Sequence, residues 1–206
     1  KAFAISVPAP QNEVYNYSTV SAASEFEVDK NGKVVMYYGV GGTAESPTTE
    51  APEVLYFPEG AKSLQTHNFL SAGIDKTKIK AIIFPEGFEL VKNQSVLSPV
   101  FKGWTGLEAV YCPDTLTSFC AFPSTPTHPG QSGEAFNGCT SLKYVRLSDE
   151  MKILPFKTFM NCSSLVNVNI PSGLELFGGT AFGSNTMLRT ALVLPRTITQ
   201  FGNTIV

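Results

Sequence analysis

The strongest constraint on this chain is a phrase that returns at a nearly constant spacing. It reads AFNGCTSLKYVRL at 135–147, TFMNCSSLVNVNI at 158–170 and AFGSNTMLRTALVL at 181–194. A phrase that recurs every ~20–50 residues is typical of one structural unit that is copied and stacked. The sequence therefore predicts a solenoid, in which each coil contacts only its neighbours.

Each repeat is anchored on the residue that ends its strand-like segment. The six anchors are Pro58, Pro85, Pro113, Ser148, Pro171 and Pro195. Apolar residues lie one and three positions before each anchor, and three and six positions after it. The column three before the anchors is Leu55, Ile82, Val110, Val145, Val168 and Leu192, and the column six after is Leu64, Val91, Phe119, Leu154, Phe177 and Phe201. No charged residue occupies any of these positions, so we expect them to form one continuous core.

The spacing between anchors varies because some coils carry insertions. The longest insertion, FPSTPTHPGQSG at 122–133, falls between the offsets that recur in each repeat and leaves the apolar columns intact. Insertions of this kind are expected to form loops on one side of a solenoid, where they can carry contacts. The loop, including His128, is therefore a second candidate for binding, although its proline and glycine content fits a passive loop equally well.

The segments before the anchors have the pattern of half-buried strands. LKYVRL and LVNVNI alternate apolar and polar residues with a period of two. A proline then ends the segment because it cannot donate the next backbone hydrogen bond. One coil cannot bury its apolar side alone, so stacking on a neighbour must satisfy both the side chains and the backbone.

The pattern AFxxCxSLxxVxIPxxLxxFGxxAF resembles the BspA-like leucine-rich repeats of bacterial surface proteins. The best copies are residues 135–154 and 158–182, and the resemblance covers about residues 53–206. It implies a mainly β, right-handed leucine-rich-repeat solenoid, here of about five to six coils. It also implies association with the cell envelope and attachment to host proteins or to other cells.

The first 50 residues do not fit the repeat. SEFEVDKNGKVVMYY at 24–38 predicts a β-hairpin around an Asp-Lys-Asn-Gly-Lys turn. GGTAESPTTEAP at 41–52 has the composition of a linker. We therefore expect residues 1–50 to form an N-terminal cap or a small β module with a linker, followed by the solenoid at 51–206.

The composition argues against binding to nucleic acid or to a membrane. The net charge is −2 with no long run of one sign, which disfavours nucleic acid and anionic lipid. No apolar stretch reaches the ~18 residues needed for direct membrane insertion. Because the chain begins with Lys1 rather than Met, we expect a processed start and an exported protein. We expect it at the cell surface, with or without a lipid anchor, or secreted.

The chain has four cysteines, which are Cys112, Cys120, Cys139 and Cys162. Cys139 and Cys162 hold the same place in adjacent repeats, so their side chains should point the same way, which is poor geometry for a disulfide. We predict small buried thiols rather than disulfides. No cysteine pair has CxxC spacing, and neither His67 nor His128 lies in a repeat column, so we expect no metal and no cofactor.

Strand alternation predicts a candidate binding surface of two adjacent outward columns. The column two before the anchors is Tyr56, Ile83, Tyr111, Arg146, Asn169 and Val193, and the column four before is Val54, Ala81, Ala109, Tyr144, Asn167 and Ala191. We expect ligand binding at Tyr56, Tyr111, Tyr144, Arg146, Asn167 and Asn169. Tyrosine and arginine are enriched at binding hot spots, although the same residue types are also ordinary on an exposed sheet.

These features favour a non-catalytic surface or secreted module that binds a host or bacterial surface protein or a glycan. A structural spacer or interaction scaffold in a larger envelope protein is the alternative. A polysaccharide-degrading β-helix enzyme would need acidic or basic residues that converge on one face. The outward columns contain one arginine and no Asp, Glu, His or Lys, so we expect no catalytic residues.

Overall fold

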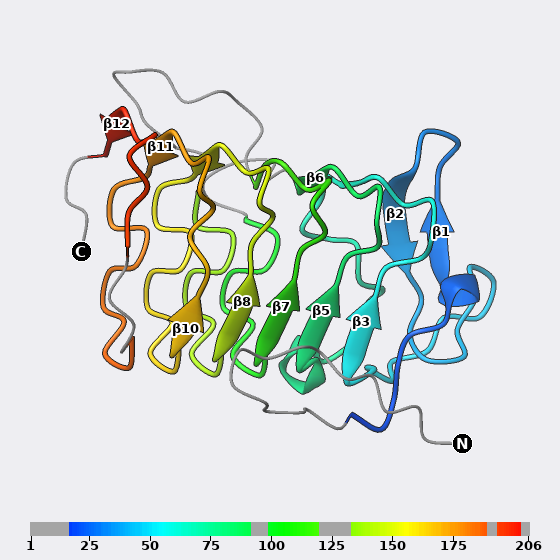
Figure 1. The fold of residues 1–206 in the computed structure, drawn as a ribbon. Helices are drawn as coiled ribbons and strands as arrows, with labels where there is room; N and C mark the ends of the chain where they lie inside the picture. The colour runs from blue at the N-terminus through cyan, green and yellow to red at the C-terminus, as the bar shows by residue number, and fades with distance from the viewer. Residues whose placement is uncertain (1–16, 92–98, 120–132, 189–192, 203–206) are drawn as a thin grey trace.

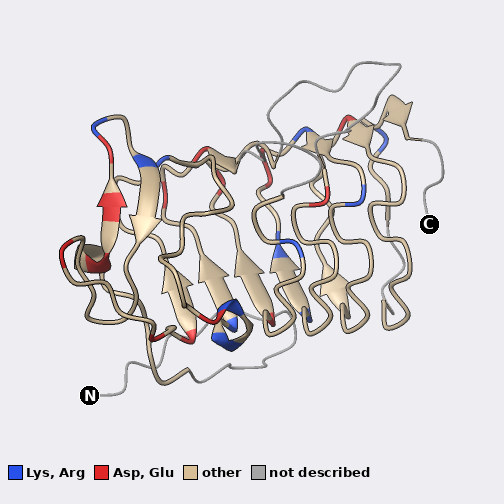
Figure 2. Ribbon diagram, turned by 180° about the vertical axis from the view of Figure 1, so that it is seen from behind, with Lys and Arg blue, Asp and Glu red and all other residues tan. Residues whose placement is uncertain are grey.

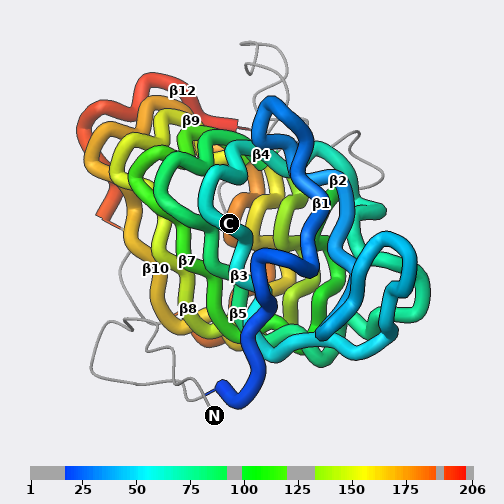
Figure 3. The backbone as a smooth tube through the Cα atoms, turned by 90° about the vertical axis from the view of Figure 1, so that its right-hand side faces the viewer, coloured from blue at the N-terminus to red at the C-terminus, as the bar shows by residue number. Residues whose placement is uncertain are grey.

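The chain winds into a stack of coils around one continuous interior (Figures 1 and 3). The computed structural model describes residues 17–91, 99–119, 133–188 and 193–202. Its regular elements are short strands and two single turns of 3-10 helix, η1 (Ala23–Glu25) and η2 (Lys76–Lys78). The predicted mainly β solenoid is therefore confirmed.

One side of five successive coils contributes a strand to a five-stranded parallel sheet. Its strands, in spatial order, are β3 (Val54–Tyr56), β5 (Ala81–Ile83), β7 (Ala109–Tyr111), β8 (Tyr144–Arg146) and β10 (Asn167–Val168). The strands align without a slip, so Leu55, Ile82, Val110, Val145 and Val168 form one row of register partners. All five side chains are buried, as their column predicts. Leu192, the last member of that column, lies outside the described residues.

A second row of strands follows the opposite side of the coils. It consists of β4 (Ser63–Leu64), β6 (Leu90–Val91), β9 (Ile153–Leu154), β11 (Leu176–Phe177) and β12 (Gln200–Phe201). The pairs β4 with β6, β9 with β11 and β11 with β12 are parallel. A single bridge from Leu90 to Ser118 carries the row into the next coil.

The predicted hairpin is β1 (Phe26–Val28) and β2 (Lys33–Tyr37), paired antiparallel. The Asp29 carboxylate accepts the N–H groups of Asn31 and Lys33, which fixes the turn. β2 also pairs in parallel with β4, so the hairpin extends the second row of strands beyond the first coil. The division of the chain at residue 50 stays a prediction.

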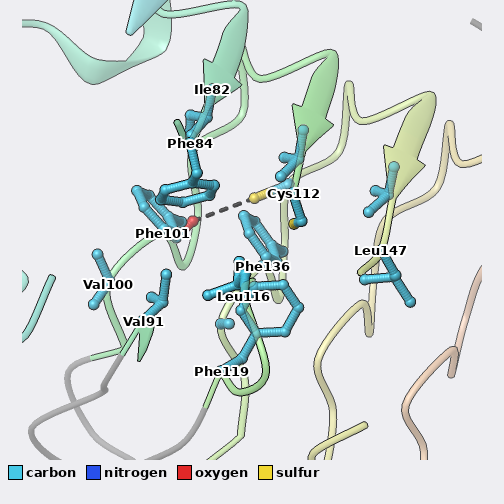
Figure 4. Packing of buried hydrophobic residues seen from close by; sticks show 14 of the residues in the cluster. Ile82, Phe84, Val91, Val100, Phe101, Cys112, Leu116, Phe119, Phe136 and Leu147 are labelled. Carbon is cyan, nitrogen blue, oxygen red and sulfur yellow. Dashed lines mark hydrogen bonds between the residues drawn. The ribbon is translucent and has the colours of Figure 1, made fainter. Parts of the chain in front are cut away.

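The interior is dominated by aromatic side chains that stack from coil to coil. Phe101, Phe136, Phe159 and Phe182 open equivalent phrases, and the centroids of successive rings lie 5.3, 5.5 and 5.5 Å apart. Figure 4 shows Phe101 and Phe136 among the neighbouring apolar side chains. Backbone hydrogen bonds join the same coils. The N–H of Phe136 donates to the Thr158 carbonyl, and the N–H of Phe159 donates to the Ala181 carbonyl. Aromatic pairs of this kind add to the stabilisation that burial supplies.

The last described coil departs from the predicted columns. Phe201 is 48% exposed, and Leu194 and Ile198 are only partly buried. Phe177, the member of the same column one coil earlier, is fully buried. The physical reason is that no described residue packs on the outer side of β12, so the coil loses one of its two neighbours.

Each coil turns one corner on a residue with a left-handed backbone conformation. The corner residues are Gly103, Gly138, Asn161 and Ser184, with φ of 71°, 77°, 59° and 62°. Glycine adopts this conformation without a steric cost, whereas other residues pay roughly 1 kcal/mol or more. Asparagine is among the residues that tolerate this conformation best, so Ser184 is the corner whose side chain disfavours it most.

Candidate binding face

The residues predicted to face outward lie together on the outer side of the five-stranded sheet. They form a small cluster that is separate from the main core, with Val54, Ala81 and Ala109 at its centre. Tyr56, Ile83, Tyr111 and Tyr144 pack around that centre. The predicted inward and outward alternation is therefore confirmed.

Part of this face is covered, which the sequence analysis did not predict. Tyr17 packs on Val54, Ala81 and Ala109, and all four residues are buried. The expectation that these three sheet residues are exposed is wrong. The physical reason is that Tyr17, from the N-terminal segment, packs in one cluster with these small side chains and helps to remove them from water.

Residues 18–21 extend the sheet beyond β3. The N–H of Ser21 donates to the Val54 carbonyl, and the N–H of Val54 donates to the Thr19 carbonyl, both at 2.9 Å. Val20 forms a parallel bridge with Val54. The outer edge of β3 is therefore paired, as an exposed edge strand requires if it is not to bind other chains.

Tyr56 and Tyr111 are half-buried beside Tyr17. The Tyr56 hydroxyl lies 3.5 Å from a carboxylate oxygen of Glu59. Burial and this carboxylate raise the pKa of Tyr56. Both rings keep a part of their surface exposed, so they remain able to contact a ligand.

Arg146 is held in place by three neighbours. Its guanidinium lies 5.3 Å from the centre of the Tyr111 ring, which is a cation–π distance. Nη2 donates to Asp114 Oδ1 at 2.6 Å, and Nη1 donates to the carbonyl of Cys112. Burial opposes the charge, but the bond to Asp114 outweighs it and raises the pKa of Arg146. A ligand would meet a preordered cation.

Tyr144, Asn167 and Asn169 lie toward the C-terminal end of the face. Tyr144 and Asn167 are register partners on β8 and β10, and both are half-buried. Asn169 Oδ1 accepts the N–H of Leu147 at 2.7 Å, and its Nδ2 donates to the Leu147 carbonyl at 3.0 Å. The Asn169 amide thus replaces the backbone pairing where β10 ends, which gives this predicted ligand-binding residue a structural role.

A row of charges borders the face at the start of the strands, and sequence reasoning missed it. Glu53, Lys80, Glu108 and Lys143 each lie five residues before an anchor. Lys80 Nζ is 2.6 Å from Glu53 Oε1, and Lys143 Nζ is 3.4 Å from Glu108 Oε2. The alternation of sign at that offset was the available signal. Figure 2 shows acidic and basic residues interspersed rather than gathered by sign.

The cysteines at the repeat position are buried thiols that bind the preceding coil. The Cys139 thiol donates to the Phe101 carbonyl and the Cys162 thiol to the Phe136 carbonyl, each at 3.2 Å; the bond at Phe101 is dashed in Figure 4. Burial raises the pKa of Cys162 to about 12. Cys112 is buried and free as well, whereas Cys120 lies outside the described residues. The prediction of buried thiols is therefore confirmed for these three cysteines.

The described ranges lack two further features. No group of three or more His, Cys, Asp and Glu side chains there is placed to hold a metal ion. Likewise, those ranges contain no helix with the length and apolarity that crossing a membrane requires. Of the loop predicted as a second contact region, only Gly133 is described, and His128 lies outside.

Stacked coils with a flat outer sheet define the class as a leucine-rich-repeat solenoid protein. Residues 74–205 match the family model of the BspA type leucine rich repeat region, with six copies of the repeat. Because the match spans more than half of the chain, the protein belongs to the BspA-type leucine-rich-repeat family.

Solved structures of bacterial leucine-rich-repeat proteins share the fold. The Treponema pallidum leucine rich repeat protein is 18% identical with a TM-score of 0.60, covering 87% of this chain and 83% of its own. A leucine rich cell surface protein from Faecalibacterium prausnitzii A2-165 is 18% identical with a TM-score of 0.56. That match covers 86% of this chain but only 37% of the other. A comparison with curated proteins found no match.

Proposed function

We propose that this protein is a non-catalytic binding module that engages a protein or a glycan through the outer face of the five-stranded sheet. The face is a flat parallel sheet on a rigid core, which holds side chains in fixed positions before a ligand arrives. The part of the face that no described segment covers, on β7, β8 and β10, carries Tyr111, Tyr144, Arg146 and Asn167. Asn169, which also supports the backbone there, remains a predicted ligand contact.

The observation that carries the proposal is the packing of Arg146 against Tyr111. Two partly exposed groups that favour binding hot spots are locked by Asp114 and by the Cys112 carbonyl, so little conformational entropy is lost on binding. The two outward columns themselves supply no carboxylate, imidazole or amine for acid–base chemistry, and the charged groups beside them are engaged in ion pairs. This composition supports a recognition surface rather than an active site.

The location of the protein is part of the same proposal. Membership of the BspA-type family and the likeness to a protein described as a cell surface protein support export, to the surface or into the medium. A lipid anchor or a further domain would set the distance from the membrane.

The test is attachment to arrays of host proteins, bacterial surface proteins and glycans. The double variant Tyr111→Ala with Arg146→Ala should lose binding to any ligand that the wild type retains, by at least tenfold in Kd. Lys152→Ala, an exposed change near the opposite row of strands, is the matched control and should bind normally. Unchanged binding by the double variant would exclude this face, and no ligand on any array would support the spacer alternative instead.

A further inference from the structure

We propose that the three small residues Val54, Ala81 and Ala109, together with the outer edge of β3, form a binding site for an extended peptide that carries an aromatic side chain. In this structure Tyr17–Ser21 occupy that site as an intramolecular ligand. The proposal deepens the proposed function, since it uses the same sheet face and names one class of partner. It concerns the β3 side of the face, away from Asn167.

The surface under Tyr17 is suited to a ring. Val54, Ala81 and Ala109 occupy the same column on three adjacent parallel strands, which lie about 4.8 Å apart. Two of the three side chains are single methyl groups, so a flat ring can approach the backbone closely. Tyr144 takes the next place in that column on β8 and packs against the cluster, so the run of small residues ends there.

The edge of β3 supplies recognition that does not depend on side chains. The N–H and C=O groups of Val54 are used by Thr19 and Ser21 in a parallel addition to the sheet. Addition of a strand to a sheet edge is a general mode of peptide binding, in which main-chain hydrogen bonds give affinity and side-chain sites give specificity.

Three hydroxyl groups of the segment add specificity, and the one on Thr19 accepts the Glu53 N–H at 2.9 Å. Ser18 Oγ donates to Glu53 Oε2 at 2.6 Å, and its N–H donates to the same oxygen. Ser21 Oγ donates to the Tyr56 carbonyl at 3.0 Å and accepts the Tyr56 N–H at 2.8 Å. We therefore expect the site to prefer a peptide with an aromatic residue at its first position. Hydroxyl-bearing residues should be preferred at the second and third positions, and serine or a similar residue at the fifth.

An intramolecular segment competes strongly with free peptide. A short tether gives an effective concentration of roughly millimolar, so the wild-type site should bind added peptide weakly. Weakening the internal segment should open the site to a peptide of the same pattern. This difference separates a binding site from an edge strand that serves only to complete the fold.

The experiment measures fluorescence anisotropy of a labelled peptide with the sequence Tyr-Ser-Thr-Val-Ser. The full chain is compared as wild type, as Tyr17→Ala and with the control Lys152→Ala. Tyr17→Ala should bind the peptide at least tenfold more tightly than the wild type or the control. A peptide with alanine in place of tyrosine should bind Tyr17→Ala at least tenfold more weakly.

Further variants keep the test decisive. Ala81→Leu and Ala109→Leu, placed in the Tyr17→Ala chain, should abolish peptide binding because they fill the space of the ring. If Tyr17→Ala does not fold, as judged by circular dichroism, Ser18→Ala removes the internal hydroxyl that bonds Glu53, leaves Glu53 free for the peptide, and is tested instead. A folded opened variant that binds the peptide no better than wild type would overturn the proposal. The assay contains no surface ligand, so this failure would leave the site at Arg146 and Tyr144 untouched.

Discussion

Single residues at the corners of the coils limit the stability of the C-terminal half. Gly103 and Gly138 turn their corners without strain, whereas Ser184 holds the same left-handed conformation at φ 62°. Replacing Ser184 with glycine removes the contact between its Cβ and the backbone. We expect Ser184→Gly to raise the free energy of unfolding by about 0.5–1 kcal/mol, measured by urea denaturation.

The control is an exposed serine in an ordinary backbone conformation. Ser172 lies in a turn after Pro171 and has no positive φ. Ser172→Gly should destabilise the protein by a similar amount, because glycine gains freedom in the unfolded chain without relieving strain. Equal shifts of the same sign in both variants would contradict this account of the corners.

The buried thiols make stability depend on alkaline pH. Burial raises the pKa of Cys162 from 9.0 to about 12. Below pH 9 the thiol is protonated in both folded and unfolded chains. Between pH 9 and about 12 only the unfolded chain ionises, so the free energy of unfolding should fall by about 1.4 kcal/mol per pH unit for this thiol.

The measurement compares urea denaturation of the wild type and Cys162→Ser between pH 8 and pH 11. Serine can still donate to the Phe136 carbonyl but does not ionise in this range. The variant should show a shallower loss of stability above pH 9, with Cys139 and Cys112 accounting for part of what remains. Parallel curves would show that the Cys162 thiol is not protected in the folded state.

Among the elements, the edge segment at residues 18–21 depends on the charge of Glu53. Hydrogen bonds from Lys80 and Ser18 lower the pKa of this carboxyl from 4.5 to about 2. The lowered pKa means that its contribution is complete above pH 4.5 and is lost as the pH falls toward 2. We expect the Ser21 amide to lose hydrogen-exchange protection in that window, before the core strands open.

Glu53→Gln is the control for this acid release. Glutamine keeps one oxygen acceptor but carries no charge, so Ser21 should be less protected at pH 6 and its protection should change little between pH 5 and pH 2. Protection factors corrected for intrinsic exchange rates provide the comparison. If the glutamine variant followed the same pH profile as the wild type, Glu53 would not be the group responsible.

The strands show what could be predicted from sequence and what could not. The alternation in LKYVRL placed Val145 inward and Tyr144 and Arg146 outward, because a period of two fixes the side of a strand without knowledge of its neighbours. The packing of Tyr17 could not be predicted from the sequence, because it joins a segment outside the repeat to residues of three separate coils. The column Val54, Ala81 and Ala109 was a usable signal, since small apolar residues on an exposed sheet indicate a cover.

Arg146 and Asn169 illustrate a second limit of prediction from sequence. Both were placed on the outer face from their offsets, which the structure bears out in position. Their partners Asp114 and Leu147 lie 32 and 22 residues away. The pairing of a side chain with a particular backbone group depends on the stacking distance between coils. The sequence of a single repeat does not determine that distance.

Across the whole molecule, stability should depend on how many neighbouring coils a residue has. Phe177 and Phe201 hold the same repeat position, but the first is buried between coils and the second is 48% exposed. Phe177→Ala should cost about 3–5 kcal/mol of unfolding free energy, and Phe201→Ala less than about 1 kcal/mol. Chemical denaturation of the two variants gives the comparison, and similar costs would contradict the stacked-coil account of stability.

The row Glu53, Lys80, Glu108 and Lys143 has a consequence for how such a molecule can lengthen or shorten. Ion pairs join Glu53 to Lys80 and Glu108 to Lys143, so excising the coil that bears Lys80 would set Glu53 beside Glu108. Excising the next coil would set one lysine beside another. Only the removal or insertion of coils in even numbers preserves attraction along this border. A change of length by a single coil in the N-terminal half of the solenoid would therefore place like charges side by side along this border, at a cost of up to about 1 kcal/mol.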